Sequence, residues 1–119
     1  ARMAASRTLT AAEREGLWSR LTDVREAALE DYRRLDSRLH LAIAEAAGSP
    51  SLVPLVAENR MRLNALLDQI PLLPRNIAHS DDQHEAIVIA ILAGDCEGAE
   101  VAMRAHAAGS EVLLHGFLD

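Results

Sequence analysis

The sequence predicts an all-α protein, folded as an antiparallel bundle of about six helices, the first of which is truncated. Three observations predict this class. Apolar residues recur at intervals of three and four, no segment alternates in the manner of a strand, and aromatic residues make up only 3% of the 119 residues. The loops between the periodic segments are short, which makes successive helices antiparallel neighbours. We expect residues 1–119 to form one domain.

The first two predicted helices lie on either side of a capping motif. Residues 1–7 have the composition of the last turns of a helix whose start is missing. Thr10 and Glu13 have the spacing of a capping box, in which each side chain bonds to the backbone of the other residue. A helix over about residues 11–27 follows. Its apolar stripe consists of Leu17, Leu21 and Val24.

The middle of the chain predicts two longer helices. The first extends over about residues 30–47 and ends before Gly48, at the position where glycine favours a left-handed conformation. Ser49 and Pro50 predict the start of the second helix, as its N-cap and its first helical residue. Apolar residues at helical spacing continue that helix to about Ile70.

The last third of the sequence predicts an irregular segment and two more helices. Prolines bracket residues 71–79, which we expect to form a loop, and a role of this loop as a pocket lid stays open. Ser80 and Gln83 have the spacing of a second capping box, which predicts a helix over residues 81–93. A Gly-Asp pair separates that helix from a last one over about residues 96–115.

Charge and composition exclude several functions. The formal net charge is −6, so the chain has no electrostatic basis for binding nucleic acid by itself. No apolar run reaches the roughly 18 residues that a transmembrane helix needs, and no secretory signal is visible. The single cysteine, Cys96, excludes an internal disulfide and suits a reducing compartment. We therefore expect a cytoplasmic protein that does not contact a membrane.

Four residues on three predicted helices form a candidate metal site. Asp36 and His40 lie one helical turn apart and point the same way, so that together they can hold a cation. His84 and His106 each lie on the apolar stripe of another helix, which places both inside the bundle. One cation would satisfy all three imidazoles, whereas without it each needs its own hydrogen-bond partner in the core. Spacing alone leaves both arrangements open.

The remaining histidines and acidic residues are weaker candidates. His79 lies in the predicted loop and His115 near the end of the last helix, so we expect both at the surface. Cys96 starts a helix after a tight turn, where a small residue is sufficient and no reactivity is needed. The sequence contains no His-Glu-x-x-His, glycine-rich phosphate-loop or serine-elbow motif. Five acids are expected on solvated faces, namely Asp31, Glu45, Asp81, Asp82 and Glu85.

Four short motifs occur in order along the chain. Residues 36–40 have the sequence Asp-Ser-Arg-Leu-His, and residues 46–52 form a helix junction, Ala-Ala-Gly-Ser-Pro-Ser-Leu. Residues 83–95 contain Gln-His-Glu-Ala-Ile and then Ala-Ile-Leu-Ala-Gly-Asp, and residues 99–106 fit Ala-x-x-x-Met-x-x-His. Together these motifs resemble the FCD domain, the effector-sensing domain of the FadR subfamily of GntR-type bacterial transcription regulators. The resemblance covers nearly the whole chain from Thr10.

Three positions depart from the family pattern. Leu39 replaces the aromatic residue before the first histidine, and Ser49 replaces the asparagine of the helix junction, where serine caps a helix equally well. Gln83 replaces the usual acid before His84, so that the charge around that ligand differs from the family pattern. None of the three changes removes a metal ligand.

The resemblance implies a function and a set of ligands. In the family, the aspartate and the three histidines of these motifs bind a divalent metal, and here they correspond to Asp36, His40, His84 and His106. Zn²⁺ is the first expectation, with Ni²⁺ or Mn²⁺ as alternatives. The resemblance also implies a small organic acid, a carboxylate, as effector beside the metal, and a homodimer. It implies a winged helix-turn-helix domain before this one, absent from this chain, that binds operator DNA.

A second anchor for the effector is expected on the helix that follows Pro50. At about 100° per residue, Asn59 falls in the middle of the apolar stripe, with Arg62 at one edge and Arg60 at the other. A polar residue at the centre of a stripe is unusual for a pure core. We therefore predict effector contact for Asn59 and Arg62, with Arg60 as a further candidate. The alternative is that both arginines extend to water.

Two other functions stay open at this point. A metal-dependent hydrolase would use the same Asp-His₃ set to activate water, but it needs a general base near the metal, and no carboxylate has a clear inward position for that task. A metal-free helical interaction domain would keep the histidines in its core. Metal analysis separates the last alternative from the other two, and turnover of esters and amides identifies the enzyme.

Overall fold

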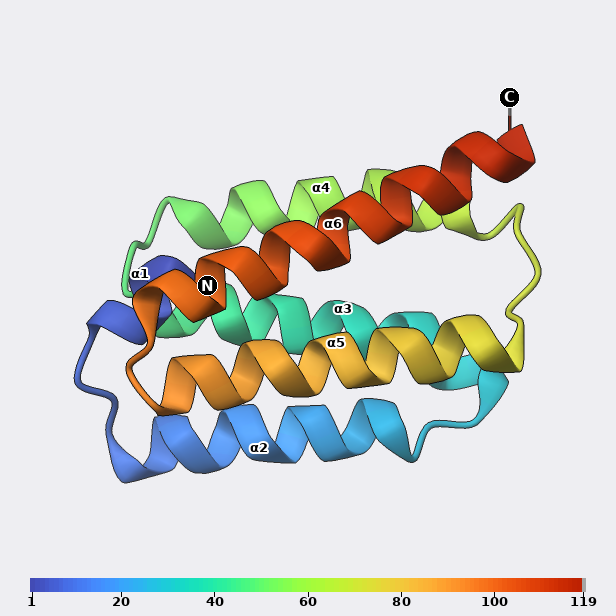
Figure 1. Cartoon of the computed structure of the whole chain (residues 1–119). Helices are drawn as coiled ribbons and strands as arrows, with labels where there is room; N and C mark the ends of the chain where they lie inside the picture. The colour runs from blue at the N-terminus through green and yellow to red at the C-terminus, as the bar shows by residue number, and fades with distance from the viewer. Residues whose placement is uncertain (119) are drawn as a thin grey trace.

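The computed structural model describes residues 1–118, with side chains as far as Gly116. The described residues contain six helices and no strand, so the all-α class is confirmed (Figure 1). None of these helices is both long enough and apolar enough to cross a membrane. The helices are α1 Arg2–Ser6, α2 Ala11–Arg25, α3 Leu29–Ala46, α4 Leu52–Leu67, α5 Pro74–Leu92 and α6 Cys96–Leu118.

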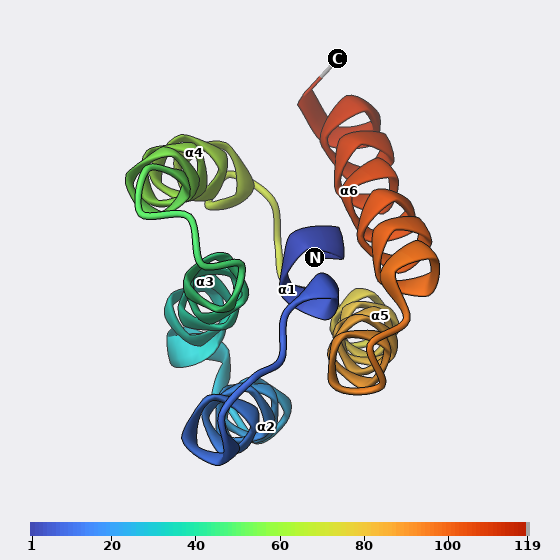
Figure 2. The ribbon, with the colours of Figure 1, turned by 90° about the vertical axis from the view of Figure 1, so that its left-hand side faces the viewer.

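The helices are arranged as an open arc when the bundle is viewed along its length. In Figure 2 the order around the arc is α4, α3, α2, α5 and α6, and the short α1 lies near its middle at one end. Packing follows this order, because α3 contacts α2 and α4, while α5 contacts α2 and α6. α1 packs on α6, α5 and α3. The inner faces of α3, α4 and α6 therefore look toward a common interior.

Two predicted helix ends are confirmed. Thr10 Oγ1 accepts a hydrogen bond from the backbone N–H of Glu13 at 3.1 Å, and Glu13 Oε1 accepts one from the backbone N–H of Thr10 at 3.1 Å, which completes the capping box of α2. Gly48 after α3 has φ +76°, and a Cβ there would lie 2.8 Å from Arg7 Nε. Both the conformation and the close approach of Arg7 therefore require glycine.

Two predicted helix starts are wrong. α5 begins at Pro74, so the segment expected as a loop at residues 71–79 is mostly helical, and Ser80 lies inside α5 instead of capping it. Proline at the first helical position is favourable because it lacks only an N–H that has no partner there. α4 begins at Leu52, so Ser49 and Pro50 precede the helix by a turn instead of starting it.

The apolar core is assembled from every helix except α4. Its fully buried side chains lie on the inward-facing stripes of their helices. Burial of each contributes about 1.5–3 kcal/mol to the stability of the fold. Asp36, His84 and His106 interrupt these apolar stripes and are buried as well. The largest enclosed apolar side chains are Leu17, Leu21, Val24, Leu39, Ile87 and Val88.

Candidate metal centre

Four side chains from three helices converge inside the bundle. Asp36 and His40 lie one turn apart on α3, His84 lies on α5 and His106 on α6. Asp36, His84 and His106 are buried, with exposed fractions of 9%, 1% and 7%. These three residues and His40 each offer one ligand atom, and the four atoms all lie within 4.8 Å of one another. The structure therefore brings together all four residues that the sequence predicts as metal ligands.

The short separations in this cluster match the geometry of a metal site. His84 Nε2 lies 2.9 Å from Asp36 Oδ1 and 3.2 Å from His106 Nε2, and His40 Nε2 lies 3.5 Å from Asp36 Oδ1. Ligands about 2.0–2.2 Å from one divalent ion are separated by about 2.9 Å at a right angle and about 3.4 Å at a tetrahedral angle. Two of the observed values lie in this range and the third, at 3.5 Å, is just above it, so the cluster could hold a divalent metal.

Hydrogen bonds within the described part of the chain do not satisfy the cluster. Asp36 Oδ1, His40 Nε2 and His84 Nδ1 are buried and have no hydrogen-bond partner there. Each buried polar atom without a partner costs about 1–3 kcal/mol. His84 Nε2 and His106 Nε2 lie within hydrogen-bond distance of each other at 3.2 Å, but that contact satisfies neither Asp36 Oδ1 nor His40 Nε2. A cation at that centre would satisfy Asp36 Oδ1 and His40 Nε2 at once.

Gln83 fixes the protonation of one histidine. His106 Nδ1 donates to Gln83 Oε1 at 2.7 Å, which leaves the lone pair of His106 Nε2 directed at the cluster. A second-sphere partner of this kind orients a metal ligand and sets its tautomer. Gln83 Nε2 in turn lies 3.3 Å from His79 Nε2. The sequence singled out Gln83 as a departure from the family pattern but gave no sign of this contact.

The protonation states of the cluster suit metal binding. Burial, and then the neighbouring His84 and His40, lowers the pKa of His106 to about 3. Burial is also the main cause that lowers the pKa of His40, so both imidazoles are neutral near pH 7. Burial by itself would raise the pKa of Asp36, but contacts with His40 and His84 and the charge of Arg60 outweigh it and hold that pKa well below its usual range. Neutral imidazoles and an ionised carboxylate are the forms that bind metals.

Arg60 is the inward-facing arginine of α4. Arg60 as a whole is 8% exposed, and its Nη2 donates a hydrogen bond to Asp36 Oδ2 at 2.5 Å. Arg60 Nε donates to Ser37 Oγ at 3.3 Å, and Asn64 Nδ2 donates to the same oxygen at 2.9 Å. These bonds tie α4 to α3 beside the candidate metal ligands. The i, i+4 spacing of Arg60 and Asn64 is the sequence signal that could have identified this polar link.

The predicted effector contacts divide into two groups. Asn59 and Arg60 line a cavity that also includes His40 and His106. Arg62 lies outside this lining: its side chain is 78% exposed and donates to Glu58 on the same helix at 2.9 Å. Arg60 and Arg62 are two residues apart, which corresponds to a rotation of about 200° around the helix, so the two side chains leave α4 on nearly opposite sides.

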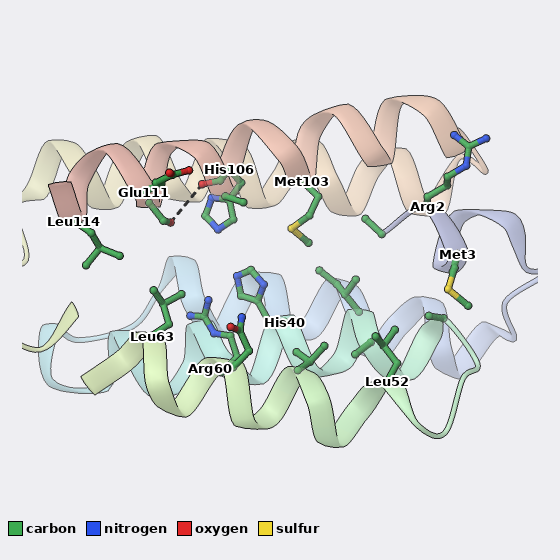
Figure 3. A pocket seen from close by; sticks show the side chains of 18 residues that line it. Arg2, Met3, His40, Leu52, Arg60, Leu63, Met103, His106, Glu111 and Leu114 are labelled. Atoms are coloured by element: carbon green, nitrogen blue, oxygen red, sulfur yellow. Dashed lines mark hydrogen bonds between the residues drawn. The ribbon is translucent and has the colours of Figure 1, made fainter. Parts of the chain in front are cut away.

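The cavity lies between the inner faces of α3, α4 and α6 and has a volume of about 530 Å³. Figure 3 shows His40 and His106 facing each other across it, with Arg60 beside His40 and with Met103, Leu52 and Met3 farther along. A cavity of this size falls in the range of small-molecule binding sites. An anion inside it would therefore have access to two of the predicted metal ligands.

The weaker candidates lie away from this centre. His79 and His115 are exposed, as expected. Cys96 is half-buried at the start of α6 with a free thiol and does not line the cavity. Asp81 differs from the expectation of a solvated acid, because its Oδ1 is buried without a hydrogen-bond partner in the described part of the chain. Burial raises the pKa of Asp81.

Comparison with known proteins identifies the family. The FCD domain matches residues 1–109. Two curated relatives, from Escherichia coli (strain K12) and Shigella flexneri, both carry the name "Putative L-lactate dehydrogenase operon regulatory protein". Each is 36% identical over 78 residues, which cover 60% of this chain and 29% of the relative, and no solved structure matches significantly. The chain thus spans less than a third of these relatives. It belongs to the FCD family, the effector-binding domains of GntR-type transcription regulators, and is a regulatory domain, not an enzyme.

Proposed function

We propose that this domain senses a small organic acid through a bound divalent metal, most suitably Zn²⁺, held by Asp36, His40, His84 and His106. The observation that carries this proposal is the convergence of four ligand atoms within 4.8 Å, together with the buried Asp36 Oδ1 and His40 Nε2, which have no hydrogen-bond partner among the described residues. Three nitrogen donors and one oxygen donor suit Zn²⁺, and Ni²⁺ is compatible with the same set. When bound, the metal supplies a positive charge and a coordination position for a carboxylate.

The residues around the cluster have the chemistry to receive that carboxylate. Arg60 uses Nε and Nη2 for Ser37 and Asp36, so its Nη1 donates no hydrogen bond within the described chain. Arg60 and Asn59 both line the cavity beside His40 and His106. A carboxylate at the metal would therefore have a guanidinium and an amide as further donors. Arg62 has no part in this proposal, because its side chain is exposed.

In the full regulator, this domain would sense the effector while a separate domain binds DNA. We infer that DNA binding belongs to a winged helix-turn-helix domain outside this chain, as the FCD family implies, and that two copies form a cytoplasmic homodimer on operator DNA. Effector binding would then shift the equilibrium between two arrangements of the helices and so change the affinity for DNA. Leu55, Met61 and Leu66 on α4 are large exposed apolar side chains that suit a second copy.

Metal analysis tests the proposal directly. The purified chain, loaded with zinc and then dialysed, is expected to retain one zinc per chain by mass spectrometry under native conditions. His84→Ala and His106→Ala should each lose it, while His79→Ala, which changes an exposed histidine outside the cluster, should retain it. Retention of zinc by both cluster variants would refute the assignment. L-lactate or acetate binding to the zinc-loaded chain, measured by calorimetry, tests the effector site.

A further inference from the structure

The cavity continues well beyond the metal ligands. Along α3 it is lined from His40 to Ala47, seven residues or about 10.5 Å at 1.5 Å per residue. Along α4 it is lined from Arg60 back to Leu52, eight residues or about 12 Å. Because α3 and α4 are successive antiparallel helices, both runs extend toward the same end of the bundle, where Met3 of α1 lies (Figure 3).

The lining changes character along this distance. His40, His106, Asn59 and Arg60 provide polar groups beside the metal ligands, and we call this part the metal end of the stretch that leads toward Met3. On the other side of the metal end the lining continues with Leu63, Ser110, Glu111 and Leu114. Arg2 also lines the cavity, but its guanidinium is bound to Glu100 at 2.9 Å. The stretch between these ends is apolar, and we name it the apolar corridor. It consists of Met3, Ile43, Ala44, Leu52, Val56 and Met103.

A small hydrophilic acid would leave most of this corridor unfilled. Apolar surface that stays in contact with water gains nothing on binding, whereas a hydrocarbon body would displace that water at a favourable free energy. Three bonds of extended chain span about 3.3–3.6 Å, so 10.5 Å corresponds to roughly nine bonds. The alanines on α3 are what keep the corridor open, because a larger side chain there would occupy it.

We propose that the effector of this protein is an amphiphilic monocarboxylate with a hydrocarbon body of about six to eight carbons. Its carboxylate lies at the metal and Arg60, and its body lies in the apolar corridor between α3, α4 and α6. This inference rests on the proposed function, because it specifies the class of acid that the same site binds. The corridor then discriminates among acids by their apolar length, while the metal end recognises the charge that all of them share.

A chain-length series tests the inference. Affinities of the zinc-loaded 119-residue chain for acetate, L-lactate, hexanoate and octanoate are measured by calorimetry at one salt concentration. Each buried methylene is expected to raise the affinity about three- to fourfold, so octanoate should bind at least 100-fold more tightly than acetate. Octanol, which has the body but not the carboxylate, should bind far more weakly than octanoate.

Filling the corridor provides the matched test. Ala44→Leu places a branched side chain in the corridor and should weaken octanoate binding at least tenfold while leaving acetate binding unchanged. Val56→Phe on α4 does the same from the opposite wall and serves if Ala44→Leu fails to fold. Ala108→Leu is the control, because Ala108 is exposed on α6 and does not line the cavity.

The outcomes separate the two proposals. If acetate and L-lactate bind the zinc-loaded chain as tightly as octanoate, or if the corridor variants bind octanoate like the control, the amphiphilic effector is refuted and the metal-dependent sensor stands. If no carboxylate binds the zinc-loaded chain, or if octanoate binds equally well without zinc, the proposed function fails and the inference fails with it.

Discussion

Replacing His84 by leucine should separate metal binding from folding. His84 is 1% exposed, and its Nε2 lies 2.9 Å from Asp36 Oδ1 and 3.2 Å from His106 Nε2, at the centre of the cluster. Its Nδ1 is buried without a partner in the described part of the chain. Leucine is similar in size and has no polar atom. We therefore expect His84→Leu to abolish zinc binding while the metal-free fold keeps or gains stability.

The size of the stability change follows from the polar contacts that His84 lacks and those that it makes. Removing one buried polar atom without a partner relieves about 1–3 kcal/mol, and losing the contact between His84 and His106 costs about 0.5–1.5 kcal/mol. The metal-free variant should therefore lie between about 0.5 kcal/mol less stable and about 2.5 kcal/mol more stable than the metal-free parent. At about 2.1 cal/mol/K per residue, 119 residues give an unfolding entropy near 0.25 kcal/mol/K, so 1 kcal/mol shifts the melting temperature by about 4 °C.

Zinc should reverse the order of the two proteins. A ligand at 100 times its dissociation constant stabilises the folded state by about 2.7 kcal/mol, which corresponds to about 11 °C for the parent and to no shift for His84→Leu. Thermal unfolding followed by circular dichroism, once with a chelator and once with zinc, measures all four values. His115→Leu changes an exposed histidine on α6 and should keep the full zinc shift.

Two results would refute this reasoning. A metal-free His84→Leu protein that melts more than about 8 °C below the parent would mean that the imidazole holds the fold together without a metal. A variant that still shows the full zinc shift would mean that the metal binds elsewhere.

Three further predictions concern the surroundings of the cluster. Gln83→Leu should weaken zinc binding about 10- to 100-fold in competition with a chelator, because His106 loses the partner that orients it, whereas Gln83→Glu should bind at least as tightly as the parent. The metal-free chain should lose stability as the pH falls from about 6.5 toward 3. Because the pKa values of His40 and His106 are lowered in the folded state, the unfolded chain binds more protons in this pH window. Melting temperatures that stay constant across the window would contradict this prediction. Arg60→Met should weaken acetate binding to the zinc-loaded chain at least tenfold, or about 1.4 kcal/mol, while Arg62→Met leaves it unchanged; equal effects would argue against an anion site at Arg60.

The sequence predicted the helices well where a local rule decides the outcome. Thr10 and Glu13 form the expected capping box, and Gly48 ends α3 in a left-handed conformation. The rule failed at Ser80, whose spacing to Gln83 also fits a capping box. There the helix had already begun at Pro74, and Gln83 binds His106 and His79 instead of reaching back toward the backbone of Ser80. The same residue types at the same spacing can occur inside a helix and at its start, so the capping pattern alone does not locate the first residue of a helix.

The site was predictable to the extent that it depends on helical periodicity. Asp36 and His40 share a face because they lie four residues apart, and His84 and His106 lie on apolar stripes that must face inward. The choice between Arg60 and Arg62 depends on how α4 is rotated about its own axis. That rotation is set by packing on α3 and by the bond between Arg60 and Asp36, which no pattern within α4 contains.

The charges of the site explain why a metal and an anion belong together in the proposed mechanism. Asp36 is ionised and Arg60 is bound to it, so this buried pair is neutral, and the lowered pKa values keep His40 and His106 uncharged near pH 7. A divalent cation among these ligands adds two positive charges, and Glu111, the other acid that lines the cavity, has a 73% exposed side chain whose charge is screened by water. Burying such an excess is costly unless an anion accompanies it. The bound metal would thus leave an excess of buried positive charge that a carboxylate effector neutralises. Zinc removal should therefore abolish carboxylate binding even though Arg60 remains in place.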